Sequence, residues 1–379
     1  MKSRAMVQVA DRRLEMQEIE VPRVAPAEAL LRVEACGLCG SDIEQYRGTF
    51  SGKRPDSYPL IPGHEPVGVI EEIGSEAARS WGVRAGDRVA LVPHLTCGRC
   101  GLCLSGRAHL CKSLLPVPKP VYGMIPLGYS HGLWGGYSEY MHLHPRTIFC
   151  KLPDSVPASM ATMYQALASG LRWAVHVPAT VMSDSVLVMG CGQRGLASVW
   201  ALRRAGVSNI IVTGLARDRA KLDLARRLGA SHTIVADQEN TVDRVMAFTH
   251  GRGVDVAIDV VPGSPQPVID AVEAIRVGGT IVVAGIKGVA NTVALCTDRL
   301  LYKEITLKGV YTQGADAYRD AVEFMASDLA VLEPLHTHEV PLDRVEEAIL
   351  RLAGELPGDP ICISVHPPGV AKPISGAID

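Results

Sequence analysis

A tight cluster of cysteines is the strongest chemical signal in the chain. Cys97, Cys100 and Cys103 follow one another with two residues between neighbours, and Cys111 follows after seven more intervening residues. Three thiolates at this spacing wrap one face of an ion and the fourth closes its shell, as in a tetrahedral Cys₄ zinc site. An iron–sulfur cluster and four unrelated buried cysteines are the alternatives. We predict a structural metal site that takes no part in catalysis.

A glycine-rich turn carries the second signal. Gly190, Gly192 and Gly195, with Gln193 and Arg194 between the last two, form a G-x-G-x-x-G pattern that follows an apolar stretch and opens a helix. The first glycine permits the turn, the second lets backbone N–H groups reach a pyrophosphate, and the third allows close helix packing. The helix N-terminus favours the phosphate charge. These five residues are therefore expected to bind a dinucleotide.

The strand expected at 210–213 ends without the acid that would hold a ribose 2′-hydroxyl. Gly214 stands there, with Arg217 and Arg219 just beyond. An acid would repel a 2′-phosphate, whereas glycine and arginines admit and pair it, so NADP is expected. NAD is the alternative, because two arginines at a helix start are also an ordinary solvated pair. Asp218 is expected to cap that helix.

Two later strand ends, at 259–263 and 285–288, are also rich in glycine. Ligands of parallel sheets bind at the carboxyl ends of the strands. Val261, Gly285 and Ile286 are therefore expected to wall a nicotinamide pocket, although such strand ends also occur without a ligand.

Two short fragments near the N-terminus contain metal-ligand residue types. One holds Cys39, Ser41 and Asp42, and the other holds His64 and Glu65. Each is weak alone, because an isolated Cys or His is usually just packed in a core. With the cysteine loop and the glycine motif they form a consistent set.

Taken together, the motifs resemble the zinc-containing medium-chain dehydrogenase family, which includes alcohol, sorbitol, threonine and glucose dehydrogenases. The likeness runs from about Arg32 to Val365. It implies that Cys39 and His64 bind a catalytic zinc ion, that Ser41 takes the substrate proton, and that Asp42 orients the ring of His64.

One position departs from the family pattern. The third zinc ligand is usually Cys, Asp or Glu, and the matching residue here is Gln165. The resemblance implies that Gln165 is a ligand and that Glu65 approaches the metal, giving two zinc ions per chain with the cysteine loop. The rival interpretation is that Gln165 is no ligand and the site is poor in metal.

Two further residues are candidates for the proton path and the substrate pocket. Glu44, three residues after Ser41, occupies the place of a His that leads the proton to solvent in some relatives. His94 matches a His of threonine dehydrogenases near the active site. Together with Gln165, it favours a polar, polyhydroxylated or amino-alcohol substrate.

The rhythm of the sequence changes near residue 185. Short alternating apolar stretches, expected as strands, come first, at 30–35, 67–73, 88–92 and 136–142. Buried strands then alternate with glycine-terminated helices: strands at 186–189, 210–213, 254–261 and 280–284, helices at 196–205 and 218–228. Two more helices are expected at 316–326 and 342–353.

The expected fold class is α/β, with two domains. The resemblance implies a GroES-like, β-rich catalytic domain at 1–166, completed by 315–379, and a Rossmann doubly wound parallel-sheet domain at 167–314. At 379 residues the chain is long enough for both cores.

Composition limits the partners. The formal net charge of -2 offers no basic surface for nucleic acid or membranes, and no apolar stretch approaches the ~20 residues of a membrane helix. The first residues lack the apolar core of a signal peptide, so a cytoplasmic location is expected. The family resemblance implies a homodimer or homotetramer that acts on a small-molecule alcohol or carbonyl. The alternatives are a zinc-free NADPH-dependent enone or quinone reductase and a non-catalytic protein that keeps the fold.

Overall fold

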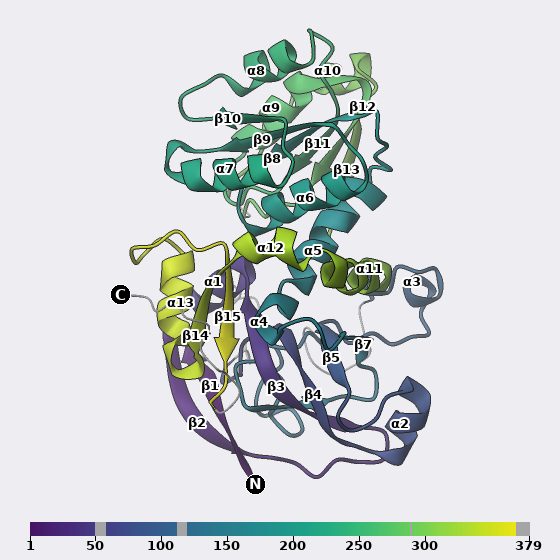
Figure 1. The fold of residues 1–379 in the computed structure, drawn as a ribbon, viewed down its shortest axis with the longest axis vertical. Helices are drawn as coiled ribbons and strands as arrows, with labels where there is room; N and C mark the ends of the chain where they lie inside the picture. Colours follow the sequence, from purple (N-terminus) through teal and green to yellow (C-terminus); the bar gives the residue numbers. More distant parts are fainter. Residues whose placement is uncertain (50–57, 112–119, 289, 369–379) are drawn as a thin grey trace. The chain divides into compact units, whose positions relative to one another are not determined.

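The protein is described by a computed structural model that covers residues 1–49, 58–111, 120–288 and 290–368 (Figure 1). The chain divides into two compact units. Unit 1 contains Met1–Tyr164 and Tyr318–Asp379, and unit 2 contains Gln165–Ala317. No helix in the described ranges is both long enough and apolar enough to cross a membrane.

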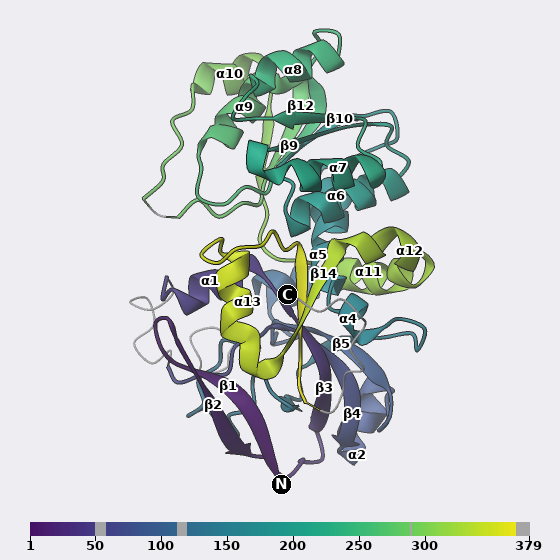
Figure 2. The ribbon, with the colours of Figure 1, turned by 60° about the vertical axis from the view of Figure 1, so that its left-hand side comes forward.

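Unit 1 is built on a mainly antiparallel sheet. Its strands lie in the order β14 (His336–Pro341), β15 (Cys362–His366), β3 (Ala29–Leu38), β4 (Glu65–Ile73), β5 (Arg88–Val92) and β7 (Ile148–Lys151), and β6 (Tyr140–Leu143) also pairs with β3. The C-terminal strand β15 pairs antiparallel with β3, and β14 lies parallel to β15 (Figure 2). The last part of the chain thus completes the sheet that the first part begins.

Unit 1 also contains a hairpin and several helices. β1 (Lys2–Ala10) and β2 (Arg13–Glu20) pair antiparallel, and β2 alternates between exposed and half-buried residues as a solvent-facing strand should. The helices are α1 (Gly40–Tyr46), α2 (Ser75–Trp81), α3 (Gly101–Leu104), α4 (Ala158–Ala161), α11 (Ala315–Ser327), α12 (Leu329–Leu332) and α13 (Val345–Leu352).

Unit 2 is a parallel sheet with helices on both faces. The strand order is β10 (His232–Val235), β9 (Asn209–Gly214), β8 (Ser185–Met189), β11 (Val254–Asp259), β12 (Ile275–Val283) and β13 (Thr306–Gly309). This is the 3-2-1-4-5-6 order of a dinucleotide-binding fold. Every residue of β8 and β11 is buried, because helices cover both faces of the sheet.

The helices of unit 2 follow the strands in alternation. Figure 1 shows α6 and α7 on one face of the sheet and α8, α9 and α10 on the other. Their bounds are α5 (Tyr164–Gly170), a π-helix (Leu171–His176), α6 (Gln193–Arg204), α7 (Arg219–Arg227), α8 (Thr241–Phe248), α9 (Gln266–Ala274) and α10 (Thr297–Tyr302). The α/β fold class expected from the sequence is confirmed.

Several expected boundaries were wrong. The helix expected at 196–205 begins earlier, at Gln193, because Gly192 already caps it. The strand expected at 136–142 is confined to β6, because Ser138 makes an isolated bridge with Ala5. The strand expected at 280–284 begins at Ile275 and includes the register shift of β12 against β11.

Asp218 is the N-cap residue of α7, as expected, but its side chain makes no capping hydrogen bond to that helix. Its carboxylate instead accepts a hydrogen bond from the backbone N–H of Leu215, at 3.0 Å, and so closes the 3₁₀ turn Ala216–Asp218 that precedes α7.

Candidate metal centres and cofactor site

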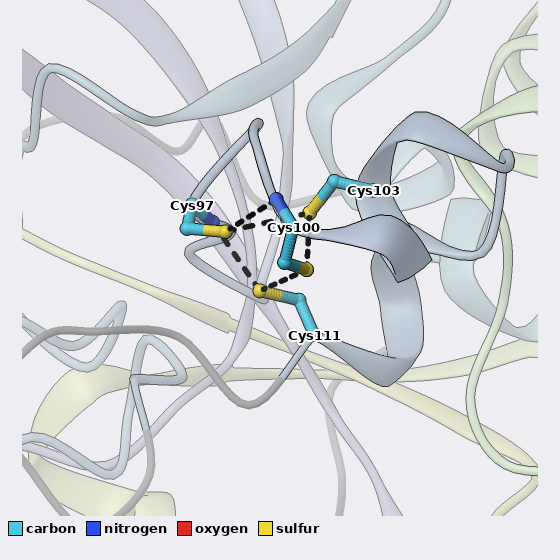
Figure 3. A group of neighbouring side chains, drawn as sticks. All are labelled: Cys97, Cys100, Cys103 and Cys111. Carbon is cyan, nitrogen blue, oxygen red and sulfur yellow. Dashed lines mark hydrogen bonds between the residues drawn. The ribbon is translucent and has the colours of Figure 1, made fainter.

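Four thiols converge in the loop after β5. The short helix α3 and the 3₁₀ turn Ala108–Leu110 bring them together (Figure 3). The Sγ of Cys103 lies 3.6 Å from that of Cys100 and 3.9 Å from that of Cys97, and the sulfurs of Cys100 and Cys111 are 3.8 Å apart. Zn–S bonds of about 2.3 Å in a tetrahedron separate the sulfurs by roughly 3.8 Å. The four thiols therefore fit a zinc ion.

The four thiols of this loop differ in acidity. The backbone N–H of Arg99 lowers the pKa of Cys97 to about 6, whereas burial raises the pKa of Cys103 to about 12. Backbone N–H groups also point at the sulfurs, from Cys97 to Cys111 at 3.4 Å and from Cys100 to Cys97 at 3.3 Å. The loop is thus prepared for negative charge, but holding four thiolates together requires a cation.

A second cluster forms where β3 ends and β4 begins. Cys39 is the N-cap of α1, and His64 immediately precedes β4. The antiparallel register places Gly37 opposite Glu65, which brings these two strand ends together. One donor atom each from Cys39, His64 and Glu65 lies within 4.8 Å of the others, and all three residues are buried. A thiolate, an imidazole and a carboxylate form a donor set suited to zinc.

Ser41 lies within this cluster. Its hydroxyl donates to the Sγ of Cys39 at 3.2 Å and lies 3.1 Å from the Nε2 of His64. Unlike its neighbours, Ser41 is only half-buried. The hydroxyl is thus held beside two ligand-type atoms while remaining accessible from outside.

Asp42 orients both of the ligand-type residues. Its Oδ2 accepts the backbone N–H of Cys39 at 2.9 Å, and its Oδ1 lies 3.3 Å from the Nδ1 of His64. Burial disfavours the charged imidazole, but the Asp42 carboxylate outweighs this and raises the pKa of His64 well above its usual range. A metal ion that binds the Nε2 of His64 would displace a proton from the charged imidazole. The affinity of the site for the metal should therefore fall at low pH.

Glu65 reaches the cluster because of a glycine on the neighbouring strand. A Cβ at Gly37 would lie 2.5 Å from the Oε2 of Glu65, so any side chain there would push the carboxylate away. Gly37 therefore keeps space for Glu65 next to β3.

In unit 2, the glycine turn lies between β8 and α6. Gly190 has φ 102°, a conformation that favours glycine. A Cβ at Gly195 would lie 1.9 Å from the carbonyl oxygen of Gly190, so the third glycine is required for packing. A Cβ at Gly192 would meet nothing within 4 Å, which leaves open space at the N-terminus of α6. That space fits a pyrophosphate.

The end of β9 has no room for an acidic side chain. Gly214 is buried, and a Cβ there would lie 2.5 Å from the Sγ of Cys191. Arg217 is exposed and makes no ion pair within the described residues, whereas Arg219 donates to the Oε1 of Gln238 at 3.0 Å. Both side chains are exposed, so the charge of either arginine is available to a ligand.

The two strand ends expected to wall the nicotinamide pocket are tied together. Lys287 forms a buried ion pair with Asp259, at 2.7 Å, and donates to the carbonyl of Val261 at 2.5 Å. A Cβ at Gly285 would lie 2.2 Å from that same carbonyl. Ile286 is exposed, and its carbonyl accepts the N–H of Gly263 at 2.9 Å.

Comparison with known proteins shows the family of the chain. Residues 25–154 match the family described as "Alcohol dehydrogenase GroES-like domain", and residues 195–327 match "Zinc-binding dehydrogenase". A probable alcohol dehydrogenase of Mycobacterium tuberculosis is 37% identical over 94% of this chain and 96% of its own. The chain belongs to the zinc-type medium-chain dehydrogenase/reductase family.

Two further relatives extend the comparison. Sorbitol dehydrogenase of Bacillus subtilis is 29% identical over 92% of this chain and 93% of its own. An alcohol dehydrogenase structure from Thermotoga maritima, 26% identical, superposes with a TM-score of 0.84 over 97% of this chain and 100% of its own. The chain is thus a zinc-binding oxidoreductase that uses a nicotinamide cofactor, as the resemblance implied.

The remaining predicted residues of the catalytic site are Gln165, His94 and Glu44. Gln165 is buried on α5, where its backbone carbonyl accepts the Ser169 hydroxyl at 2.9 Å. His94 is half-buried after β5 and forms an isolated backbone bridge with Val121. Glu44 is half-buried on α1, one turn after Ser41. Their roles as ligand, substrate contact and proton relay stay predictions.

The side chain of Arg194 turns away from the expected phosphate position. It contacts the hydroxyl of Ser169, and its guanidinium lies over the ring of Trp173, 5.3 Å from the centroid. A cofactor contact by Arg194 would therefore use its backbone N–H. Gln193 is half-buried at the start of α6.

The sequence did not indicate that Lys287 links the two strand ends. The available signal was its place between glycines at the end of a strand, next to the expected nicotinamide wall. Its partner, Asp259, stands 28 residues earlier in the chain, and only the parallel pairing of β11 with β12 brings the two together.

Proposed function

We propose that this dehydrogenase interconverts an alcohol and its carbonyl compound by hydride exchange with NAD(P), with polyols, sugars or amino alcohols as the favoured substrates. The relatives named alcohol and sorbitol dehydrogenase support this substrate class. The polar candidates His94 and Gln165 favour a hydroxylated substrate over an apolar one.

The single observation that carries the proposal is the position of Ser41. Its hydroxyl lies within 3.2 Å of both the Cys39 sulfur and the His64 Nε2. A substrate hydroxyl at this cluster would be within reach of Ser41, which can take the proton as the C–H bond gives up its hydride. Glu44 lies on the same face of α1, one turn further on, and offers a path for that proton to solvent.

Cys39, His64 and Glu65 would hold the catalytic zinc ion, joined by Gln165, and the four-cysteine loop would hold a structural one. Lewis acidity from zinc and hydride exchange from the nicotinamide are the chemistry that the bound groups supply. The chain's own contribution is to orient His64 through Asp42 and to place Ser41 for proton transfer.

Substitution of Ser41 tests this function. Ser41→Ala should lower turnover by about 10²–10⁴-fold, the usual contribution of a proton-transfer group, because it removes the hydroxyl without touching a ligand. Zinc content, expected at two ions per chain, and cofactor affinity should stay unchanged. Ser41→Thr keeps the hydroxyl and should retain most of the activity. The measurements are steady-state turnover on alcohols, polyols and sugars, with elemental analysis of the same samples.

Full activity in Ser41→Ala would remove this residue from the reaction. Combined with fewer than two zinc ions in freshly purified protein, that result would favour the zinc-free enone or quinone reductase. The convergence of Cys39, His64 and Glu65 argues against that reductase, because it would have no use for a buried donor set of this kind.

The proposed cofactor is NADP, with NAD as the alternative. Gly214 leaves no acid to repel a 2′-phosphate, and the exposed Arg217 can pair with it. The phosphate loop would consist of Gly190, Gly192 and Gly195 with the backbone of the intervening residues.

The protein is further proposed to be a cytoplasmic homodimer or homotetramer. All ten cysteines are free thiols in the structure, and the four-cysteine site needs a reducing compartment to stay intact. Self-association is supported by β13, an edge strand of the unit 2 sheet whose four residues are all exposed.

A further inference from the structure

A third group of metal-ligand side chains lies in unit 1 and shares no residue with the two zinc centres. It consists of Glu28, His131 and His142, with one donor atom of each within 4.8 Å of the others. The three residues come from separate parts of the chain: the turn before β3, the loop before β6, and β6 itself.

Backbone pairing fixes two of the three residues. The antiparallel register of β3 and β6 places Leu30 opposite His142, and the N–H of His142 donates to the carbonyl of Leu133 at 2.8 Å. Glu28 closes a turn in which its N–H donates to the carbonyl of Ala25 and its Oε2 accepts the Ala25 N–H at 3.2 Å. Neither residue depends on a flexible segment for its position.

The ring of His142 is buried in an apolar wall. Its side chain is 1% exposed, and the indole of Trp134 packs edge-on against it, with centroids 4.9 Å apart. The Nδ1 of this ring has no hydrogen-bond partner. The Nε2 lies 3.1 Å from the Oε2 of Glu28, but the two are not aligned as a hydrogen bond. A buried ring with unsatisfied nitrogens destabilises the fold unless something else satisfies it.

The three side chains supply donor types that transition metals bind in proteins. Two of them are imidazoles and the third is a carboxylate.

We propose that Glu28, His131 and His142 bind a divalent transition-metal ion such as Zn²⁺, Co²⁺ or Ni²⁺. Zn–N and Zn–O bonds of about 2.0–2.1 Å in a tetrahedron separate two ligands by roughly 3.3 Å. The 3.1 Å between the His142 Nε2 and the Glu28 Oε2 matches this separation. Two imidazoles and one carboxylate with open positions suit these ions.

His131 completes the site from the outside. It is exposed, and its ring centroid lies 4.8 Å from that of His142. The turn that carries it is held by Trp134, whose Nε1 donates to the carbonyl of Tyr129 at 2.7 Å. A small rotation of the exposed ring brings its nitrogen to the metal. The bound ion would then clamp this turn to β6 and to the turn before β3.

Cobalt titration tests the proposal on the full, zinc-loaded chain without a polyhistidine tag. Co²⁺ at a site of nitrogen and oxygen ligands gives visible d–d bands, whereas Co²⁺ that replaces zinc at a cysteine site also gives a sulfur-to-cobalt charge-transfer band. One Co²⁺ per chain is expected to bind with d–d bands and no charge-transfer band. Binding should also raise the unfolding temperature.

Matched variants locate the ion. His131→Ala and Glu28→Gln should each lose this equivalent of Co²⁺ and the accompanying rise in unfolding temperature. His176→Ala removes an exposed imidazole in unit 2 and should retain both. The proposal is overturned if Co²⁺ appears only with the charge-transfer band, or if both cluster variants bind it like the unmodified protein. Neither outcome bears on the Ser41 experiment, so the two proposals fail separately.

Discussion

Asp42 divides its carboxylate between the two ligand-type residues of the proposed catalytic centre. One oxygen accepts the backbone N–H of Cys39 and the other faces the Nδ1 of His64. A proton held at Nδ1 leaves Nε2 directed at Ser41 and Cys39, so the tautomer and the ring orientation are fixed together. The charge on Asp42 therefore acts through His64, and Ser41 is the residue that we propose takes the substrate proton.

The proposed preference for NADP over NAD also involves a close approach between Gly214 and Cys191. An aspartate at position 214 would favour NAD by repelling a 2′-phosphate, but its Cβ would lie 2.5 Å from the Cys191 sulfur. The double variant Cys191→Ala, Gly214→Asp removes the contact with the sulfur, so that only the Leu222 side chain, 3.0 Å from the added Cβ, has to shift. It should reverse the preference from NADP to NAD by tenfold or more, which corresponds to about 1.4 kcal/mol. Fluorescence titration with both cofactors measures the dissociation constants.

The single variant Cys191→Ala is the control for this experiment. It changes only the sulfur, so it should keep the NADP preference of the unmodified protein. If the unmodified protein binds NAD as tightly as NADP, the argument from the missing acid at Gly214 is wrong.

Local motifs could be predicted from the sequence, whereas contacts between residues far apart in the chain could not. The cysteines at 97–111 and the glycines at 190–195 are close in the chain, so their spacing alone indicates their chemistry. Gly214 was visible as a missing acid, but its contact with Cys191 was not. Glu28, His131 and His142 are separated by up to about a hundred residues, and only the pairing of β3 with β6 joins two of them.

At the scale of elements, the start of α6 contains two glycines, Gly192 and Gly195, that are required for different reasons. Gly195→Ala should place a methyl group against the Gly190 carbonyl and destabilise the protein by roughly 1–3 kcal/mol. Gly192→Ala meets nothing within 4 Å and should change stability by less than about 0.5 kcal/mol. It should still weaken cofactor binding about tenfold, because its methyl group enters the space proposed for the pyrophosphate. Urea unfolding and cofactor titration separate the two effects. Unchanged cofactor affinity in Gly192→Ala would show that the pyrophosphate lies elsewhere.

The pairing of β14 with β15 contains a chain of hydrogen bonds between histidines. The Ser364 hydroxyl lies 2.8 Å from the Nε2 of His336 and 2.8 Å from that of His366. Burial lowers the pKa of His336 from 6.5 to about 4. Between these values the unfolded chain binds the proton first, so stability present above pH 6.5 is lost as the pH falls toward 4.

His336→Gln should reduce this acid sensitivity. Glutamine can keep a hydrogen bond to Ser364 but does not titrate. The free energy of unfolding should therefore fall less between about pH 7 and about pH 5 than in the unmodified protein, by of order 1 kcal/mol. Urea unfolding at both pH values measures the difference, and acid-induced loss of zinc affects both proteins alike. His176→Gln, at an exposed site, should show the full loss. An equal loss in His336→Gln would mean that His336 has the same pKa in the folded and unfolded states.

The order of elements in each unit was more predictable than their ends. Alternation of buried strands and helices indicated the parallel sheet of unit 2, because each crossover must return to the same sheet edge. The start of α6 was misplaced, since the glycine motif already lies in its first turn. Asp218 is the N-cap residue of α7, as expected, but its side chain bonds backward to Leu215 instead of forward into the helix. Side-chain direction at a turn depends on backbone angles that the residue type alone does not specify.

At the scale of the whole molecule, unit 2 has apolar side chains at an open edge of its sheet, where contact with water is unfavourable. β13 is the last strand of its sheet and is exposed along its length, so its backbone groups are available to a second chain. Leu301, Tyr302 and Leu307, on or near this strand, are 68%, 77% and 43% exposed. Apolar side chains at an open sheet edge support the proposal that this edge is the contact between chains.

The last prediction follows from this edge. Leu307→Lys should place a charge on the open strand and separate the oligomer into smaller species, because a buried, unpaired ammonium is costly at an interface. The mass in solution, measured by light scattering after size-exclusion chromatography, should fall from a multiple of the 40.5 kDa chain toward that single mass. Val331→Lys, at a half-exposed apolar residue of α12 in unit 1, introduces the same charge and should leave the mass unchanged. A monomeric unmodified protein, or a Leu307→Lys variant with the unmodified mass, would show that β13 is not the contact between chains. If both variants lose the oligomer, the added charge itself is the cause and not its position on β13. An interface at β13 predicts that only Leu307→Lys has this effect.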